Sequence, residues 1–310
     1  MVVRLTRKEA GMNKTSIRAL AVICFLCFFC CVEVSLALDQ GKAGPEGSKF
    51  KTDFRFRKYV DEHGNQRPNP APEQIYGPLY SVGPVDVCVY LLKTSEGLIL
   101  FDAGYGTRDS SLIPDNIRKL GFDPSEIKKI FVTHWHGDHA GGATRIAALS
   151  GAETLMHRLD AEVVRTGFFQ GRPAGQPYEK VKDLEDGQEF SFGDAVVKVI
   201  HTPGQSAGEV VYLVNVGGPQ GPCRALVAGD ATGFKADPED FERMKYPGVC
   251  ADYDRTVKVL KAIQFDLYLG GHPHQVFNEM REDGFPFVTR EEWFKMVDNR
   301  YQQKVDFLKQ

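Results

Sequence analysis

The run THWHGDHAGG, residues 133–142, places three histidines and an aspartate within six positions and ends in two glycines. It overlaps the end of the apolar run KKIFVT, which is typical of a buried strand. Because alternate residues of a strand share a face, His134 and His136 are expected to point into one cleft, and the turn that follows brings Asp138 and His139 beside them. Imidazole and carboxylate are common ligands of Zn²⁺. The run therefore predicts a metal site at the end of a strand.

Histidines elsewhere in the chain support this interpretation. A single histidine is usually an ordinary surface or core residue. Five of the eight histidines, however, lie in glycine-flanked segments at predicted strand ends, where functional loops gather in layered α/β folds. These five are His134, His136, His139, His201 and His272. We expect His63 and His157 to be structural or exposed, and for His274 two interpretations stay open, a residue that supports a ligand or an exposed side chain.

Short apolar runs alternate with helical periodicity beyond residue 79. Strands are predicted at 85–94, 98–104, 128–133, 153–157, 210–216, 224–230 and 265–271, with a further hairpin in GQEFSFGDAVVKVIH, which ends at His201. Helices are predicted at 108–120, 143–149, 159–166 and 252–263 and after Thr289. Mixed hairpins and crossovers imply an α/β fold with two sheets and helices outside them.

The first 37 residues differ from the rest of the chain. Five basic residues precede the apolar run ALAVICFLCFFCCVEVSLA, which ends in the small-x-small pattern of a signal-peptidase site. We predict a signal peptide over 1–37 and a secreted or periplasmic protein with no stable membrane association after cleavage. The alternative is an uncleaved membrane anchor, since 19–38 approaches the ~20 residues that span a bilayer. Residues 38–78, rich in Gly, Pro and charge, are predicted as an extended N-terminal arm before a domain over 79–310.

Charge and cysteine content limit the partners and the covalent links. A net charge of −3 offers no broad basic field, so nucleic acid is not an expected partner. Four of the seven cysteines lie in the leader, which leaves Cys88, Cys223 and Cys250. An oxidising compartment permits one disulfide, and a pairing of Cys223 with Cys250 is one expectation. Three unpaired, mostly buried thiols are the other.

Four runs resemble, in their order along the chain, the motifs of the metallo-β-lactamase superfamily over about residues 75–280: THWHGDH, HTPGQSAGEVVY, LVAGD and GGHP. The segments EGLILFDAGY, NIRKLGF and YPGVCADYDRTVKVLKAIQFDLYLGGHP resemble the third (B3-type) subclass of metallo-β-lactamases. The resemblance implies an αββα sandwich of two mixed β-sheets with outer helices. It makes 79–310 a metallo-β-lactamase-fold hydrolase domain with its site on one edge of the paired sheets.

The resemblance also implies ligand roles and two Zn²⁺ ions per chain. The first ion would be held by His134, His136 and His201, and the second by Asp138, His139 and His272. A glutamine or a cysteine in place of one of these six residues would indicate another subclass, and neither occurs.

Such a site supports hydrolysis of an amide or an ester. Two zinc ions that share a water lower the pKa of that water and polarise the carbonyl. Asp138 is predicted to orient the attacking water and to relay its proton, so that no serine or cysteine nucleophile is needed. Asp102, in the run FDAG, is a candidate carboxylate that fixes a ligand histidine, and the alternative is a turn aspartate that caps the next segment.

The substrate depends on the residues that follow the LVAG run. The B3-type subclass typically has serines there that help to hold the β-lactam carboxylate, whereas this chain has DATG, residues 230–233. Thr232 and Lys235 are candidate substrate-binding residues. Asp230 would bridge both metals if the site is like that of glyoxalases and lactonases, and in the lactamase subclass it need not be a ligand, so both roles stay open.

The leading hypothesis is a secreted dizinc hydrolase that opens the cyclic amide of a β-lactam, a small-molecule substrate with a scissile carbonyl. The second is a hydrolase of another small ester, lactone or thioester on the same metals. The third is a mononuclear iron oxidoreductase, because related sites hold iron in sulfur dioxygenases, and metal content separates it from the first two. A non-catalytic binding protein is the fourth.

Overall fold

The computed structural model describes residues 50–230, 233–234, 237–279 and 282–310. The predicted signal peptide over 1–37 and the beginning of the predicted arm lie outside the described residues. Among the residues that are described, no helix has the length and apolar character needed to cross a membrane.

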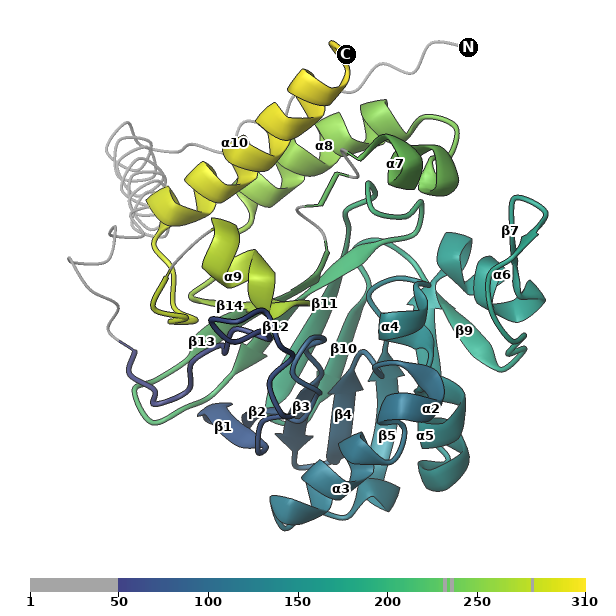
Figure 1. The fold of residues 1–310 in the computed structure, drawn as a ribbon. Helices are drawn as coiled ribbons and strands as arrows, with labels where there is room; N and C mark the ends of the chain where they lie inside the picture. Colours follow the sequence, from purple (N-terminus) through teal and green to yellow (C-terminus); the bar gives the residue numbers. More distant parts are fainter. Residues whose placement is uncertain (1–49, 231–232, 235–236, 280–281) are drawn as a thin grey trace, which may run out of the picture. The chain divides into compact units, whose positions relative to one another are not determined.

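Two mixed sheets form the centre of the fold (Figure 1). The first sheet consists, in hydrogen-bonded order, of β1 (Glu73–Tyr76), β2 (Leu79–Ser81), β3 (Tyr90–Thr94), β4 (Gly97–Phe101), β5 (Ile127–Phe131), β6 (Glu153–His157) and β9 (Val181–Leu184). The second consists of β10 (Glu189–Phe192), β11 (Ala195–His201), β12 (Val210–Val216), β13 (Cys223–Gly229) and β14 (Leu267–Gly270). Pairing is antiparallel from β1 to β4 and from β10 to β13, and parallel from β4 to β9 and between β13 and β14.

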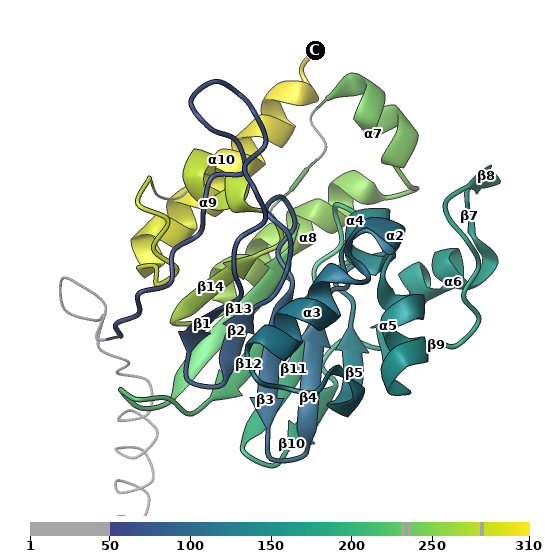
Figure 2. The same cartoon turned by 60° about the horizontal axis from the view of Figure 1, so that its bottom comes forward.

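Helices cover the outer faces of both sheets (Figures 1 and 2). Those that follow strands of the first sheet are α2 (Gly106–Asp109), α3 (Leu112–Lys119), α4 (Gly137–Ala140), α5 (Ala143–Ser150) and α6 (Arg158–Thr166), with the 3-10 turn η1 (Pro124–Glu126). Those beside the second sheet are α7 (Pro238–Met244), α8 (Val249–Ala262), α9 (Pro273–Glu279) and α10 (Arg290–Phe307). A small hairpin of β7 (Phe168–Phe169) and β8 (Arg172–Pro173) follows α6. The predicted αββα sandwich is confirmed.

Burial of both faces explains why the central strands are continuous apolar runs. On β4, Ile99 and Phe101 belong to the core between the sheets. Leu98 and Leu100, which alternate with them, pack instead in a second core with Ile117 of α3 and other outer-helix residues. The period of two along the strand therefore divides its side chains between two apolar layers.

Aromatic rings join the two sheets at their centre. Phe131 of β5 has its ring centroid 5.8 Å from that of Phe101 and 5.3 Å from that of Tyr212 on β12. The Tyr212 hydroxyl donates a hydrogen bond of 2.6 Å to the Val132 carbonyl. This cluster fixes the end of β5 against the second sheet, immediately before the histidine run.

Several elements differ from the sequence-based expectations. The strand predicted over 85–94 begins only at Tyr90. The helix predicted over 108–120 is divided into α2 and α3. The first sheet begins at β1, inside the segment predicted as an extended arm, because Gly77 takes a positive φ of 52° and closes a hairpin with β2. Phenylalanines of the same segment are buried as well, and the ring of Phe50 lies 5.2 Å from that of Phe287.

Of the two expectations for the cysteines, the structure shows the second: Cys223 and Cys250 are thiols and form no disulfide. Cys223 begins β13 and is buried in the core between the sheets, whereas Cys250 lies in the first turn of α8 and is only partly buried. Burial in apolar surroundings is a common state of cysteine and needs no cross-link.

Replacing Phe131 by alanine should lower the free energy of unfolding by about 3–5 kcal/mol, because it removes the ring that packs between the sheets and leaves a cavity. Urea denaturation monitored by circular dichroism measures this loss. Leu149→Ala is the matched control, since 47% of Leu149 is exposed and its truncation should change the free energy by less than about 1 kcal/mol. Equal losses in the two variants would contradict the assigned core.

Candidate metal centre

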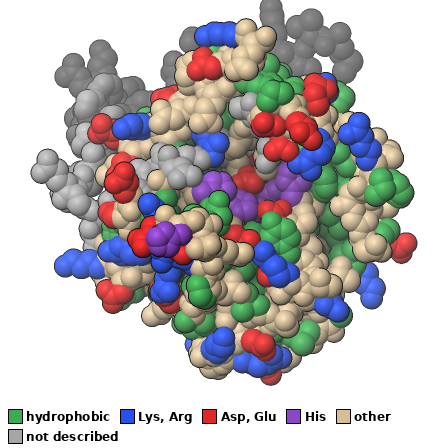
Figure 3. All heavy atoms as spheres, in the orientation of Figure 1, with side chains coloured by type: hydrophobic (Ala, Val, Ile, Leu, Met, Phe, Trp, Pro, Cys, Tyr) green, Lys and Arg blue, Asp and Glu red, His purple; other side chains and the backbone are tan. Residues whose placement is uncertain are grey.

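The predicted ligands follow the carboxyl ends of strands in both sheets. Histidines 134, 136 and 139 come after β5 and in α4, Asp230 follows β13, and His272 follows β14. Ligand sites of open α/β sheets form in the crevice at this end of the strands. Figure 3 shows histidine and acidic side chains gathered at the centre of one face.

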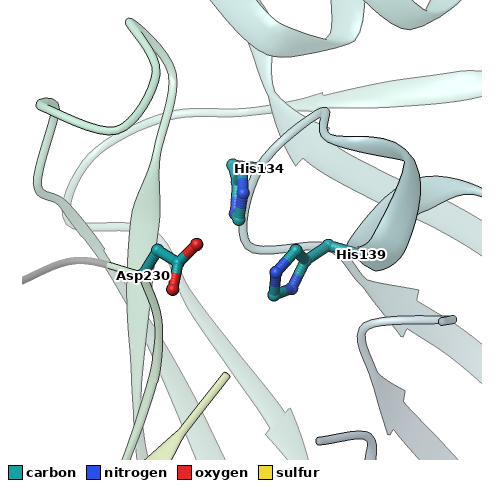
Figure 4. A group of neighbouring side chains, drawn as sticks. All are labelled: His134, His139 and Asp230. Carbon is teal, nitrogen blue, oxygen red and sulfur yellow. The ribbon is translucent and has the colours of Figure 1, made fainter. Parts of the chain in front are cut away.

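Ligand atoms of five residues converge in two overlapping groups. One group is His134, His139 and Asp230, and the other is Asp138, His139 and His272; within each group the ligand atoms lie within 4.8 Å of one another. Figure 4 shows the first group, in which the two imidazoles and the carboxylate point toward a common space. His136 adjoins it, with its Nδ1 3.0 Å from His134 Nε2.

Asp102, directly after β4, orients part of this group. Its buried carboxylate lies 2.8 Å from His139 Nδ1 and accepts a 2.8 Å hydrogen bond from the Thr133 backbone N–H and another from the Thr133 hydroxyl. Asp102 has a φ of 60°, a left-handed conformation that is uncommon for a residue other than glycine. The contact leaves His139 Nε2 directed at the other ligands, as the predicted support role requires.

Two glycines allow the second sheet to approach the histidine run. A Cβ on Gly229 would lie 2.6 Å from Thr133 Oγ1, and one on Gly271 would lie 2.9 Å from His139 Cε1. Larger residues at these positions would push β13 and β14 away from β5, so the glycines set the spacing of the centre.

The ligands from the second sheet are also held by specific contacts. His272 Nδ1 lies 2.7 Å from the Asp86 carbonyl oxygen. The Asp230 carboxylate accepts hydrogen bonds from the side-chain amides of Gln205, at 2.9 Å, and Gln275. Glu209, which is fully buried, accepts a 3.1 Å hydrogen bond from the Asp230 backbone N–H and lies 4.0 Å from His134 Nδ1.

His201, which is predicted as a ligand of the first ion, lies outside the two groups of converging ligand atoms. Its Nε2 lies 2.9 Å from the Ala207 carbonyl oxygen, and its ring stacks on His157 with centroids 4.1 Å apart. The cause is local: β11 continues through His201, which pairs with Val210, so the turn toward the site comes only after it. Gln205, four residues later, lines the cavity instead.

The remaining histidines lie outside the two groups. His157 is buried beside His201, and His63 is exposed. His274 lines the cavity, and its ring centroid lies 5.1 Å from that of His272. The candidate substrate residues Thr232 and Lys235 lie outside the described residues.

Asp160, at the start of α6, was not singled out from the sequence. Its buried carboxylate accepts hydrogen bonds from the Trp135 backbone N–H at 3.0 Å, the Ser206 hydroxyl at 2.6 Å and the Gly208 backbone N–H at 2.7 Å. It therefore braces the histidine run against the loop that carries Gln205. An acidic residue in the first turn of a helix is common, so nothing in its sequence context indicated this role.

Charges at the centre favour a cation. Burial, reinforced by His139 and His136, lowers the pKa of His134 well below its ordinary value, which leaves a neutral imidazole with a free lone pair. Burial opposes ionisation of Asp230, yet His272 and the other histidines hold the pKa of that carboxyl well below its usual range. Conversely, Asp230 and Asp138 outweigh the effect of burial and raise the pKa of His272 to about 12. Ionised carboxylates among imidazoles form the nitrogen and oxygen donor set that Zn²⁺ takes.

A cavity of about 610 Å³ opens over the centre. Its floor is formed by His136, Asp138, Gln205, Asp230 and His272. Its walls include the apolar or aromatic side chains of Tyr105, Trp135, Phe234 and Met244 and the cationic side chains of Arg243 and Arg300. The donor set and the open cavity together suit a metal centre that is accessible to a small molecule.

Comparisons with known proteins agree with this geometry. Residues 82–272 match the model of the metallo-beta-lactamase superfamily. The subclass B3 metallo-beta-lactamase BJP-1 of Bradyrhizobium japonicum is similar in structure, with a TM-score of 0.67 and 26% identity over 81% of this chain and 96% of that one. The class B3 di-zinc enzyme LRA-12 from an Alaskan soil metagenome has a TM-score of 0.68 and 26% identity over 78% and 95%.

Curated relatives match over shorter segments. The lactamase-like protein aptB of Emericella nidulans is 35% identical over 125 residues, which cover 40% of this chain and 35% of that protein. A hydroxyacylglutathione hydrolase of Maricaulis maris is 32% identical over 133 residues, 41% of this chain and 46% of that protein. These matches span between about a third and a half of the relatives' own length.

Asp102→Asn should weaken metal binding roughly 10–100-fold. The amide lacks the negative charge that orients His139, and only one of its two terminal atoms can accept a hydrogen bond. Competition with a chromogenic chelator measures the affinity. Asp115→Asn, on the exposed face of α3, is the matched control and should bind metal as the parent chain does. Unchanged affinity in the folded Asp102 variant would refute the support role.

Asp160 should make the free energy of unfolding depend on pH. Burial raises its pKa from 3.8 to about 6, so between these values the folded protein retains a proton that the unfolded chain has released. Stability should therefore fall by roughly 3 kcal/mol as pH rises through this window. Urea titrations in EDTA measure the free energy of unfolding of the parent chain and of Asp160→Asn at each pH. The difference between the two free energies should change between pH 4 and pH 6, and a difference that stays constant would contradict the assignment.

Proposed function

Because the chain belongs to the metallo-β-lactamase superfamily and is a metal-dependent hydrolase, we propose that it opens the cyclic amide of β-lactams with two Zn²⁺ ions. The observation that carries this proposal is the structural similarity to a subclass B3 enzyme, BJP-1, along 96% of its length. The converging histidines and aspartates support it further, since they supply the donors that such ions require.

Asp138 is the residue to which we assign proton transfer. Bound divalent metal ions lower the pKa of water and polarise a carbonyl. The Asp138 carboxylate lines the cavity, 3.4 Å from His272 Nε2 and 3.5 Å from His139 Nε2. Although burial opposes it, these histidines lower the pKa of Asp138, so the carboxylate is ionised at neutral pH. It can accept a proton from the attacking water and return it to the departing nitrogen when the amide C–N bond breaks.

The cavity walls fit a small anionic substrate. Arg243 of α7 and Arg300 of α10 supply positive charge at the cavity, which would attract the carboxylate that β-lactams carry. Trp135 stacks against Phe169 with centroids 5.1 Å apart and offers an aromatic wall next to the metal ligands. A carboxylate on one side and an apolar ring system on the other match these two surfaces.

A second candidate is hydrolysis of another small ester, lactone or thioester, and the position of Asp230 favours it. Its carboxylate belongs to the first ligand group and its Oδ2 lies 3.7 Å from Nε2 of His272 in the second, so it stands between the two groups as a bridging residue would. The hydroxyacylglutathione hydrolase of Maricaulis maris and an atrochrysone carboxyl ACP thioesterase of Passalora fulva, 28% identical over 142 residues, are both similar to this chain. Both names denote acyl hydrolases.

We also propose that the enzyme acts after export. The pattern of residues 1–37, basic and then apolar with a small-x-small end, supports a cleaved signal peptide. N-terminal sequencing of the protein recovered outside the cytoplasm would find Leu38 first.

The purified mature chain should hydrolyse nitrocefin or a carbapenem in the presence of zinc and lose this activity in EDTA. Asp138→Ala should lower kcat/KM at least ~100-fold, because general acid–base catalysis contributes factors of this size, while the variant remains folded. Spectrophotometric assays measure both effects. Asp115→Ala is the control for an exposed carboxylate.

Several outcomes decide between the candidates. Turnover of lactones or glutathione thioesters in preference to every β-lactam would replace the first candidate by the second. No hydrolysis by micromolar enzyme of any compound in the panel would refute both. One iron per chain by elemental analysis would favour an oxidoreductase, and a fully active Asp138→Ala variant would refute the role of Asp138.

A further inference from the structure

We propose that Gln205 makes the two metal positions unequal, so that this chain holds one divalent ion tightly and a second one weakly. The inference rests on the proposed metal-dependent function but concerns binding of the ions, not hydrolysis. The weak position is the one beside His134 and His136, where Gln205 stands in place of a third imidazole.

Gln205 lies at the centre although no sequence pattern selected it. Its side-chain nitrogen is 3.4 Å from His136 Nδ1 and donates a 2.9 Å hydrogen bond to Asp230. Only 2% of the residue is exposed, and that surface lines the cavity. The loop that carries it is braced by Asp160 through Ser206 and Gly208, so the position of Gln205 is set by packing on both sides.

Two further imidazoles lie near the centre, but His274 stands beside His272 in the cavity lining, with ring centroids 5.1 Å apart, and His201 has other partners. His201, the nearest histidine in sequence, has its Nε2 2.9 Å from the Ala207 carbonyl oxygen and its ring against His157. Its backbone N–H donates to Asp186, and its place as the last residue of β11 fixes the direction of the side chain. To reach the ions the ring would have to leave both the Ala207 carbonyl oxygen and the ring of His157.

The chemistry of the side chains makes the two positions unequal. Zn²⁺ binds imidazole nitrogen, thiolate and carboxylate, whereas a neutral amide is a much weaker donor to this ion. Gln205 moreover uses its nitrogen to hold Asp230, so it acts on a carboxylate of the centre as a hydrogen-bond donor. The position beside it therefore has two imidazoles, His134 and His136, and shares Asp230 with its neighbour.

The other position is complete. Asp138, His139 and His272 supply one carboxylate and two imidazoles whose ligand atoms converge within 4.8 Å. Both imidazoles are oriented from behind, His139 by Asp102 and His272 by the Asp86 carbonyl oxygen. Such support typically strengthens binding 10–100-fold, and the loss of a direct ligand is expected to weaken it by at least roughly as much.

The test is a titration of the EDTA-treated, dialysed mature chain with Zn²⁺. Isothermal titration calorimetry and competition with a chelator measure the affinity and the number of bound ions. The parent chain should bind one equivalent tightly and a second at least roughly 10-fold more weakly. Gln205→His should tighten binding of the second ion roughly 10–100-fold, because it adds a third imidazole to those of His134 and His136. Cobalt absorption spectra of the two proteins, taken at one and two equivalents, give an independent readout of how each position is filled.

Two variants serve as controls. Gln205→Ala supplies no donor and should leave the second step weak. His201→Ala should leave both steps as in the parent chain, because the ring points away from the centre. The inference is overturned if the parent chain binds two ions in one step of equal affinity, if folded Gln205→His shows no gain, or if His201→Ala loses an equivalent.

These results are separable from the proposed hydrolysis. A two-step titration in a chain that hydrolyses none of the tested acyl compounds would leave the inference standing and remove the proposed substrates. A single two-equivalent step in a chain that hydrolyses β-lactams would do the reverse. If Gln205→His does not fold, the titration of the parent chain decides on its own.

Discussion

The buried carboxylate of Asp102 connects the parts of the chain from which the centre is built. It follows β4, binds the backbone and hydroxyl of Thr133 at the end of β5, and orients the ring of His139 in α4. One side chain thus fixes the register between two parallel strands and the direction of a ligand. The left-handed backbone of Asp102 is the conformational cost of that arrangement, and the sheets and helices packed around it maintain it.

The centre concentrates groups that a protein core usually excludes. Histidines, aspartates and Glu209 lie buried together at the junction of the two sheets. Burying an unpaired charge is costly, and each charge here has partners of opposite sign or hydrogen-bond donors. A divalent cation would relieve the remaining repulsion among carboxylates. The same cation would add a link between the two sheets, which elsewhere are joined by apolar contacts and by hydrogen bonds such as that from Tyr212 to Val132. A bound metal would therefore contribute to the fold as well as to the reaction.

The sequence was a good guide wherever a segment is buried on both faces. β12, predicted over 210–216, spans Val210–Val216, because a strand between two apolar layers is apolar at nearly every position, and only Asn215 near its end is exposed. The burial of Phe50 and the pairing of β1 could not be predicted in the same way. Single apolar residues in a segment rich in glycine and proline show no periodicity. The residues that bury them, such as Phe287 against Phe50, lie in distant parts of the chain.

The same contrast holds within the site. The run after β5 was sufficient to locate a metal centre, because its histidines and aspartate are adjacent in sequence and the strand end brings them together. The choice between His201 and Gln205 depends on where β11 stops and how the following turn rotates the chain, and a flanking glycine indicates a turn without indicating its direction. Asp160 joins segments more than forty residues apart, and no local pattern could indicate it.

The cavity is assembled from two sets of elements with different constraints. Its floor comes from loops at strand ends, each tied to a sheet by buried hydrogen bonds, whereas Arg243, Met244 and Arg300 lie on the surface helices α7 and α10. Substitutions on those helices would alter the walls without moving a metal ligand. Proteins with this fold could therefore evolve from one acyl substrate to another through substitutions on α7 and α10, while the metal ligands stayed the same.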